Sequence, residues 1–366
     1  MHLSWAELRD FRNHRSTRLE QLSPGLVVVV GPNGEGKTNL LEGIGFLFFL
    51  ASPRTSTAEP VVRRGAEAAY ARGEIETLGG RVLVEVEIPT RGANRVQVNR
   101  SPVRRRRDLR RQVRAVFFNP DDLAIVTGDP SARRGFLDEA VRTLWPLKGS
   151  AITAYERVLR QRNRLLKEHE GVGSPTGLEA WDAELVEAGS ALIRLRADAV
   201  ERLAVTTEAE YRHLAGYGLA CGYLPSVWGQ DLEVAFAARL AERRSDELVR
   251  RTTLVGPHRD DLSLQVRDLV ARTFASHGEA WAAALCLRLG LASAVVGETG
   301  ELPVLLLDDP FSALDPRRQR RVAERLVERG QVMITVADEA QVPAQAAQVW
   351  DVADGRVARR VRGDHR

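Results

Sequence analysis

A glycine-rich loop follows an apolar run near the start of the chain. Residues 31–38 read GPNGEGKT and come directly after LVVVV at 26–30. The spacing fits G-x-x-x-x-G-K-[ST], in which backbone N–H groups cradle phosphate oxygens. In this pattern Lys37 reaches the β- and γ-phosphates, and Thr38 binds Mg²⁺ at the start of a helix. The alternative is a tight turn without a ligand. We therefore predict an ATP site made of Gly31, Pro32, Asn33, Gly34, Glu35, Gly36, Lys37 and Thr38.

Two carboxylates follow a second apolar run, Val304–Leu307. Asp308 is expected to hold Mg²⁺, and Asp309 to orient or deprotonate the attacking water, because neighbouring residues at a strand tip point to different sides. The alternative is a solvated Asp-Asp-Pro turn. The sequence thus predicts Lys37 and Asp309 as catalytic residues, Thr38 and Asp308 as metal ligands, and ATP and Mg²⁺ as cofactors.

Two shorter motifs lie on either side of this acidic strand. Ser276 and Gly278 belong to SHGE, and Ser312 and Asp315 belong to SALD. The order of the four motifs is similar to that in ATP-binding-cassette heads, where an S-x-G-x element opens a helix and binds the γ-phosphate of a second subunit. The SALD loop then lies across the dimer interface. A serine three residues before Glu279 is also an ordinary capping box, so this motif alone leaves both readings open.

The elements that must position these motifs come from both ends of the chain. β-type residues, several of them in period-two alternation, predict strands at Leu3–Leu8, Leu26–Val30, Gly73–Glu76, Arg81–Ile88, Arg95–Val98, Leu262–Val266, Val304–Leu307, Val332–Val336 and Val349–Val352. Helical spacing predicts helices at Asn39–Leu50, Trp281–Val296 and Arg317–Arg329.

The middle of the chain predicts a different structure. Residues 150–214 carry two amphipathic helical patterns, joined by GVGSPTG at 171–177, which indicates an antiparallel helical hairpin. The predicted fold class is therefore α/β. It is an ABC/SMC-like P-loop ATPase head built from residues 1–148 and 250–366, with a helical-hairpin arm, 149–249, inserted between the halves.

Composition restricts the other possibilities. The chain has 366 residues, 44% apolar and 28% charged, with a net charge of +4. The two cysteines form no C-x-x-C pair, so neither a zinc site nor a disulfide framework is expected. The N-terminus lacks a signal-peptide pattern. The longest apolar stretch, taken as Ile44–Ala51, is too short to span a membrane. A soluble cytoplasmic protein without a membrane partner is expected.

Four longer segments resemble one family. Residues 119–138 (NPDDLAIVTGDPSARRGFLD), 254–262 (LVGPHRDDL), 8–14 (LRDFRNH) and 308–315 (DDPFSALD) resemble hallmarks of the RecF family of SMC-like heads. The resemblance extends over nearly the whole chain. It implies that Arg12 and Asn13 join the ATP-binding residues, and that Ser276 and Gly278 act in trans. His277 and Glu279 depart from the family pattern. The family's glutamine loop has no clear counterpart, and the strand end at Phe117–Asn119 is the expected place.

The resemblance also implies a function. RecF-like proteins form ATP-dependent homodimers that bind double-stranded DNA and favour junctions between single- and double-stranded DNA. With RecR and RecO they help to load RecA onto gapped DNA in recombinational repair, replication restart and the SOS response. A weak, DNA-stimulated ATPase activity resets the clamp.

An arginine cluster is the expected DNA contact. Residues 103–114 read VRRRRDLRRQVR, with seven arginines in twelve residues. Arginines of this density contact phosphates without reading base sequence, although a solvated helix face is the ordinary alternative. The candidates are Arg104, Arg105, Arg107, Arg110 and Arg111, and a smaller cluster lies at Arg317–Arg321.

Two other classes of function share the nucleotide motifs. The energy-coupling subunit of an ABC transporter has the phosphate loop and SALD but lacks the 150–214 arm. A non-hydrolysing structural head is the second alternative, and Asp309, a possible base, argues against it.

Overall fold

The chain folds into two compact units that interleave along the sequence. The computed structural model describes residues 1–52, 54, 57, 60–169, 171 and 173–360. The first unit, here called the head, comprises Met1–Leu123, Ala209–Tyr217 and the chain from Ser276 onward. The second unit, here called the arm, comprises Ala124–Glu208 and Gly218–Ala275.

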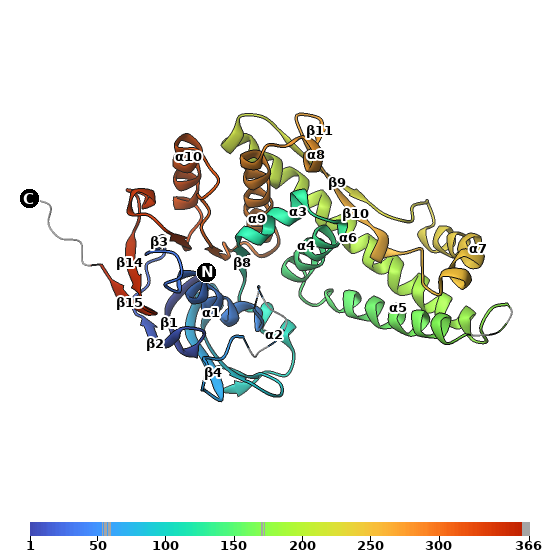
Figure 1. Ribbon diagram of the computed structural model, residues 1–366, viewed down its shortest axis with the longest axis horizontal. Coiled ribbons are helices and arrows are strands. Elements are labelled where there is room, and N and C mark those ends of the chain that lie inside the picture. Colours follow the sequence, from blue (N-terminus) through green and yellow to red (C-terminus); the bar gives the residue numbers. More distant parts are fainter. Residues whose placement is uncertain (53, 55–56, 58–59, 170, 172, 361–366) are drawn as a thin grey trace, which may run out of the picture. The chain divides into compact units, whose positions relative to one another are not determined.

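A largely parallel sheet carries the nucleotide motifs of the head. Its strands are parallel except for β15, and strands from both chain ends, blue and red in Figure 1, pair within it. Four of them are completely buried and, apart from a single threonine, read as apolar runs, as expected for strands covered on both faces. The strand order is β15 (Arg356–Arg359), β14 (Gln348–Ala353), β3 (Leu26–Val30), β13 (Val332–Val336), β12 (Val304–Leu307) and β8 (Ala115–Phe118).

An antiparallel sheet forms the other layer of the head. Its burial alternates along the strands, as in VLVEVEI of β5, because one face packs on the core. The strand order is β2 (His14–Leu19), β1 (His2–Phe11), β4 (Ala68–Thr77), β5 (Gly80–Pro89), β6 (Arg95–Val98) and β7 (Ser101–Pro102).

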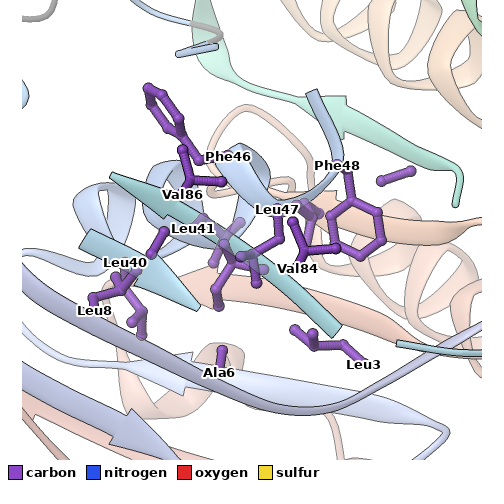
Figure 2. Packing of buried hydrophobic residues seen from close by; sticks show 14 of the residues in the cluster. Leu3, Ala6, Leu8, Leu40, Leu41, Phe46, Leu47, Phe48, Val84 and Val86 are labelled. Atoms are coloured by element: carbon purple, nitrogen blue, oxygen red, sulfur yellow. The ribbon is translucent and has the colours of Figure 1, made fainter. Parts of the chain in front are cut away.

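Helix α1 (Lys37–Phe49) packs against both sheets. It contacts β1, β4 and β5 of the antiparallel sheet and β8, β12 and β13 of the parallel one. Figure 2 shows its leucines among side chains of β1 and β5. Because partners surround it, α1 is buried on nearly all sides instead of along a single stripe. Gly43 permits the close approach, since a Cβ there would lie 2.4 Å from Leu8 Cδ1.

Two of the remaining head helices, α9 and α10, were predicted from the sequence, whereas the short α2, η1 and η3 were not. Helix α9 is longer than the predicted segment 281–296, and by length and composition it is the single helix of the described residues able to cross a membrane. It replaces Ile44–Ala51 as the longest apolar segment. However, 83% of its most apolar stretch is buried. Arg288, in the middle of the helix, forms an ion pair with Asp122 at 2.6 Å. We therefore interpret α9 as a helix of the protein core. The helices are α2 (Arg106–Arg110), η1 (Pro120–Asp122), α9 (His277–Thr299), α10 (Pro316–Val327) and η3 (Glu339–Gln341).

The arm contains the predicted helical pair and more. Helices α5 (Ser150–Glu168) and α6 (Leu178–Ala215) confirm that pair, and the last turns of α6, from Ala209, belong to the head. Residue 172 of the predicted loop at 171–177 lies outside the described residues. The other elements are α3 (Leu123–Thr127), α4 (Pro130–Leu144), β9 (Leu219–Leu224), α7 (Leu232–Arg250), η2 (Pro257–Arg259), β10 (Asp261–Val266), β11 (Leu269–Val270) and α8 (Ala271–Phe274).

The arm's bounds differ from the predicted 149–249. It begins at Ala124, because α4 packs on β10. It extends to Ala275, because β10 pairs with β9 and β11 in a three-stranded antiparallel sheet. Neither contact follows from local periodicity.

A buried arginine joins the three long helices of the arm. Arg162 of α5 is completely buried and donates to Asp182 of α6 at 2.8 Å and to Glu247 of α7 at 2.6 Å. It also donates to the Thr253 hydroxyl at 2.7 Å. Each hydrogen-bonding group of this cluster therefore has a polar partner that offsets the cost of burial.

The segment at 254–262 forms a second polar cluster inside the arm. His258 Nε2 donates to the Thr253 carbonyl at 3.0 Å, and its Nδ1 accepts from the Tyr155 hydroxyl at 2.6 Å. Asp260, also fully buried, accepts from the Ser226 backbone N–H at 2.7 Å and from Arg196 at 3.3 Å. This motif therefore serves the arm's own folding.

Candidate nucleotide-binding site

The loop between β3 and α1 has the backbone that its glycines were expected to provide. Gly36 caps α1 with φ 109°, a value that favours glycine. A Cβ at Gly36 would lie 2.4 Å from Asn13 Nδ2, and one at Gly31 would lie 2.2 Å from the Val352 carbonyl oxygen. Larger residues at both positions are therefore excluded by sterics.

Lys37 lies folded over this loop. Its Nζ donates to the Gly31 carbonyl at 2.7 Å and to the Pro32 carbonyl at 2.8 Å. Burial lowers the pKa of Lys37, while the charges of Asp308 and Asp309 oppose that shift. The ammonium group is thus held between the loop and the two carboxylates at the end of β12.

Thr38 and Asp308, which the sequence analysis predicted as metal ligands, lie in direct contact. The Thr38 hydroxyl donates to Asp308 Oδ2 at 2.8 Å. The Thr335 hydroxyl of β13 donates to Asp308 Oδ1 at 2.7 Å. Among the described residues no group of three His, Cys, Asp or Glu side chains could hold a metal. A hydroxyl and one carboxylate still suit Mg²⁺, which takes few protein ligands and completes its shell with phosphate and water oxygens.

Asp309 is the strained member of the acidic pair. Its φ of 48° lies in the left-handed region, which is uncommon outside glycine. Its N–H donates to Thr335 Oγ1 at 2.8 Å, but its buried Oδ1 has no hydrogen-bond partner among the described residues. Burial and the charge of Asp308 raise its pKa, and Lys37 opposes the shift. A half-buried carboxylate with an open oxygen and a raised pKa has the properties of a proton acceptor.

These groups surround one cavity of about 290 Å³. Residues of the predicted phosphate loop and of the predicted acidic strand both line this cavity. Its lining residues are Asn33, Gly34, Gly36, Lys37, Thr38, Asn39, Arg54, Pro120, Asp308, Asp309 and Thr335. Asn39, Arg54, Pro120 and Thr335 were missed in the sequence analysis. A lone hydroxyl in the apolar strand VMITV is the signal that could have identified Thr335.

Arg12 and Asn13 lie outside this lining and brace its walls. Arg12 forms a two-point ion pair with the buried Glu42, at 3.0 and 2.7 Å. Asn13 donates to the Glu35 carbonyl at 3.0 Å and accepts from Asn39 at 2.9 Å.

His14, which the sequence analysis did not single out, contacts the backbone of the phosphate loop. Its Nε2 lies 3.0 Å from the Gly36 carbonyl oxygen. Burial lowers its pKa, which favours the neutral ring. The segment 12–14 thus fixes the shape of the phosphate loop.

The two remaining motifs lie next to each other in the head but outside the cavity lining. Ser276 caps α9 in a capping box with Glu279, the second of the two readings left open by the sequence. A Cβ at Gly278 would lie 3.4 Å from the Ala313 carbonyl oxygen, within the SALD loop. Asp315 caps α10, where the Arg318 backbone N–H lowers its pKa. Ser312 is exposed.

The arginine cluster forms an exposed edge of the head. Arg104, Arg105 and Arg111 are exposed, and they form no ion pair within the described residues. Arg107 and Arg110, on α2, are half-buried. Three unpaired guanidinium groups within eight residues leave this edge strongly positive.

The sequence analysis placed the glutamine loop at the end of β8, which pairs with β12. Asn119 is the residue that follows β8. The Asp308 N–H donates to the Phe118 carbonyl at 2.9 Å. Asn119 caps η1, where its side chain accepts from the Asp121 N–H, and the next residue, Pro120, lines the cavity. The segment therefore reaches the correct edge of the sheet without a glutamine.

Comparison with known proteins adds independent evidence. The family model described as RecF/RecN/SMC N terminal domain matches residues 2–356. The DNA replication and repair protein RecF of Cutibacterium acnes is 40% identical, over 98% of each chain. That of Streptomyces avermitilis is 41% identical, over 98% of this chain and all of the relative.

Solved structures agree with the sequence relatives. The recombination mediator protein RecF with ATP, of the RecFOR pathway, superposes with a TM-score of 0.89 at 29% identity, over 98% of each chain. The Smc head of Pyrococcus furiosus, at 15% identity and a TM-score of 0.57, shares the fold. The predicted fold class, a P-loop head of the ABC/SMC type, is confirmed.

Proposed function

Because this chain belongs to the RecF family, we propose that it is an ATP-binding protein of DNA replication and repair, in which ATP pairs two copies of the chain on duplex DNA. The observation that carries the proposal is the joint cavity of the phosphate loop and β12. There Thr38 bonds Asp308, and Asp309 keeps an open oxygen.

Each residue of the cavity has a proposed role. Lys37 exchanges its carbonyl partners for β- and γ-phosphate oxygens, because a phosphate binds an ammonium group more strongly than a neutral carbonyl does. Thr38 and Asp308 hold Mg²⁺, which neutralises phosphate charge when bound. Asp309 orients a water molecule and accepts its proton, and hydrolysis is slow and stimulated by DNA.

The partner copy completes the site. Gly31–Thr38 of one chain and Ser276–Gly278 of the other enclose the ATP, with Ser312 and Asp315 at the interface. In the head, the adjacency of Gly278 and Ala313 supports a single contact surface made of both motifs. Such a two-fold arrangement uses each motif twice.

The proposed DNA contact is the arginine edge. Arg104, Arg105, Arg107, Arg110 and Arg111 bind backbone phosphates of double-stranded DNA near its junctions with single-stranded gaps. By its family, the chain acts in the cytoplasm with RecR and RecO to load RecA. The full-length similarity to RecF gives no support to a transporter subunit.

The decisive test of the nucleotide role is Lys37→Met. We expect ATP affinity to fall by about 10- to 100-fold, since a charge-assisted hydrogen bond contributes about 1.5–3 kcal/mol. ATP-dependent doubling of mass and DNA binding should disappear. Titration calorimetry and light scattering measure both effects, and Lys167→Met, an exposed lysine of α5, is the matched control. Near-normal ATP affinity would refute the assignment of Lys37.

The arginine edge is tested by salt. Changing Arg105, Arg107 and Arg111 to Ala should flatten the slope of log affinity against log salt by about two to three units, similarly for unrelated duplexes. The control changes Arg239, Arg243 and Arg360 to Ala, since these arginines already pair with carboxylates. Affinity is measured by anisotropy at several salt concentrations with ATP present. An unchanged slope would move the DNA site to the arm or to Arg317–Arg321.

A further inference from the structure

The signature serine is held by a carboxylate of its own helix. Ser276 Oγ accepts from the Glu279 N–H at 3.3 Å and lies 3.0 Å from Glu279 Oε2. The Ser276 N–H donates to the same Oε2 at 2.9 Å. A serine hydroxyl has a single proton to donate. In this arrangement the proton goes to Glu279.

The carboxylate is itself held from the other side. The Tyr217 hydroxyl donates to Glu279 Oε1 at 2.6 Å. The ring of Tyr217 packs edge-on against Tyr211, with ring centres 5.7 Å apart, and Tyr211 is completely buried. The packing against Tyr211 therefore fixes the position of Tyr217. Its hydroxyl in turn orients the Glu279 carboxylate toward Ser276.

The segment that carries Tyr217 is anchored to α10. Arg321 donates to the Leu214 carbonyl at 3.0 Å, and Arg325 donates to Glu210 at 3.0 Å. Glu210 is nearly buried and its pKa is lowered by Arg325 and Arg329 against the opposing effect of burial. These ion pairs keep the segment 209–217 on the head, so the tyrosine has little freedom to move away from Glu279.

We propose that Glu279 and Tyr217 form a latch that restrains Ser276 and weakens ATP-driven pairing of the two chains. The inference rests on the proposed function, in which Ser276 donates to the γ-phosphate bound by the partner copy. To make that bond, the hydroxyl must leave Glu279 Oε2. A carboxylate beside the incoming phosphate also disfavours its approach, because like charges repel. Tyr217 is a positioning residue that stabilises the latched arrangement.

The test is a gain of association. Glu279→Gln keeps the capping box, which accepts Glu or Gln, but replaces a charged hydrogen bond by a weaker neutral one. We expect ATP-dependent dimerisation to tighten by about tenfold or more, because a symmetric dimer contains two such sites. Tyr217→Phe should tighten it a few-fold. Damage to the fold would weaken association instead, so a gain separates a latch from a merely structural role.

The measurement is sedimentation of wild type and variants with ATP, together with calorimetric ATP binding by the monomer, which should not change. Glu298→Gln, at the far end of the same helix α9, controls for the lost charge. The latch is overturned if Glu279→Gln leaves dimerisation unchanged or weaker. It is also overturned if the tightening persists in full together with Ser276→Ala, since the hydroxyl would then play no part. If Ser276→Ala alone leaves dimerisation intact, the proposed trans contact itself fails.

Discussion

Two pairs of neighbouring aspartates, Asp308–Asp309 in the head and Asp260–Asp261 in the arm, differ in their hydrogen-bond partners and in the direction of their pKa shifts. In the head, Asp309 has a buried oxygen without a partner in the described structure and a pKa raised by burial and by Asp308. In the arm, Asp261 accepts hydrogen bonds from two nitrogens of Arg133, at 2.5 and 2.9 Å, and the arginine lowers the pKa of Asp261 against the opposing effect of burial. Asp260 is completely buried and fully bonded.

The difference lies in the hydrogen-bond donors that the protein supplies to each pair. The arm supplies an internal donor for each acid, so the pair stabilises the fold. The head supplies a strained backbone at Asp309 and no donor for its Oδ1. Strain of this kind persists where the surroundings over-determine the conformation, which is common at functional sites.

The largest expected effect is in the head. Asp309→Asn should reduce ATP turnover by about 10²- to 10⁴-fold, the usual contribution of a general base. ATP binding, dimerisation and thermal stability should be retained, and the DNA-bound state should last longer. Single-turnover hydrolysis and calorimetry measure these quantities. Normal hydrolysis by this variant would place the base elsewhere and remove the contrast between the two pairs.

The opposite outcome is expected in the arm. Arg196 donates to Asp138 at 2.7 Å and to the Pro257 carbonyl at 2.7 Å, and it also bonds Asp260. Arg196→Met should destabilise the arm by about 3–5 kcal/mol, because it leaves buried carboxylates uncompensated. Denaturant unfolding measures the loss, while ATP affinity of the folded protein should remain near wild type. Arg194→Met, which breaks an exposed ion pair with Glu233, is the control and should cost far less.

The smallest effect concerns pH. Burial lowers the pKa of His258 to about 4, whereas the unfolded chain keeps a value near 6.5. Between these values the unfolded state binds more protons, so stability is full above about pH 6.5 and falls as pH drops toward 4, by about 3 kcal/mol. Unfolding at several pH values, compared with His258→Gln, isolates this histidine. The variant should be less stable at neutral pH but show a flatter dependence; a parallel dependence would assign the acid sensitivity to other groups.

Local patterns predicted several strands of the head and the loop that precedes α1. The strands β3, β6, β12 and β13 were predicted at their observed bounds, because runs of β-type residues between turn residues are a short-range signal. Thr335 was missed because its role depends on the pairing of β12 with β13, which no local pattern reports. Arg54 reaches the cavity through Asn39 and Glu42, another contact between distant segments.

The arm was less predictable for the same reason. Helix α7 and strand β9 were not recognised, and the segment 130–138 was read as a family hallmark instead of the start of α4. In β9, LACGYL contains alanine, cysteine and glycine, and it is a strand because β10 pairs with all six of its residues. The domain bounds shifted with these long-range contacts.

The position of α1 between two sheets has a consequence for how the head loosens. A helix with apolar contacts to both layers cannot detach from one sheet without disturbing the other, so the layers belong to one cooperative unfolding unit. Ligand binding to the native state raises the free energy of every opening that destroys the site. A nucleotide held at the first turn of α1 would therefore slow amide hydrogen exchange in β1 and β4 as well as in β3, far beyond the residues that touch phosphate.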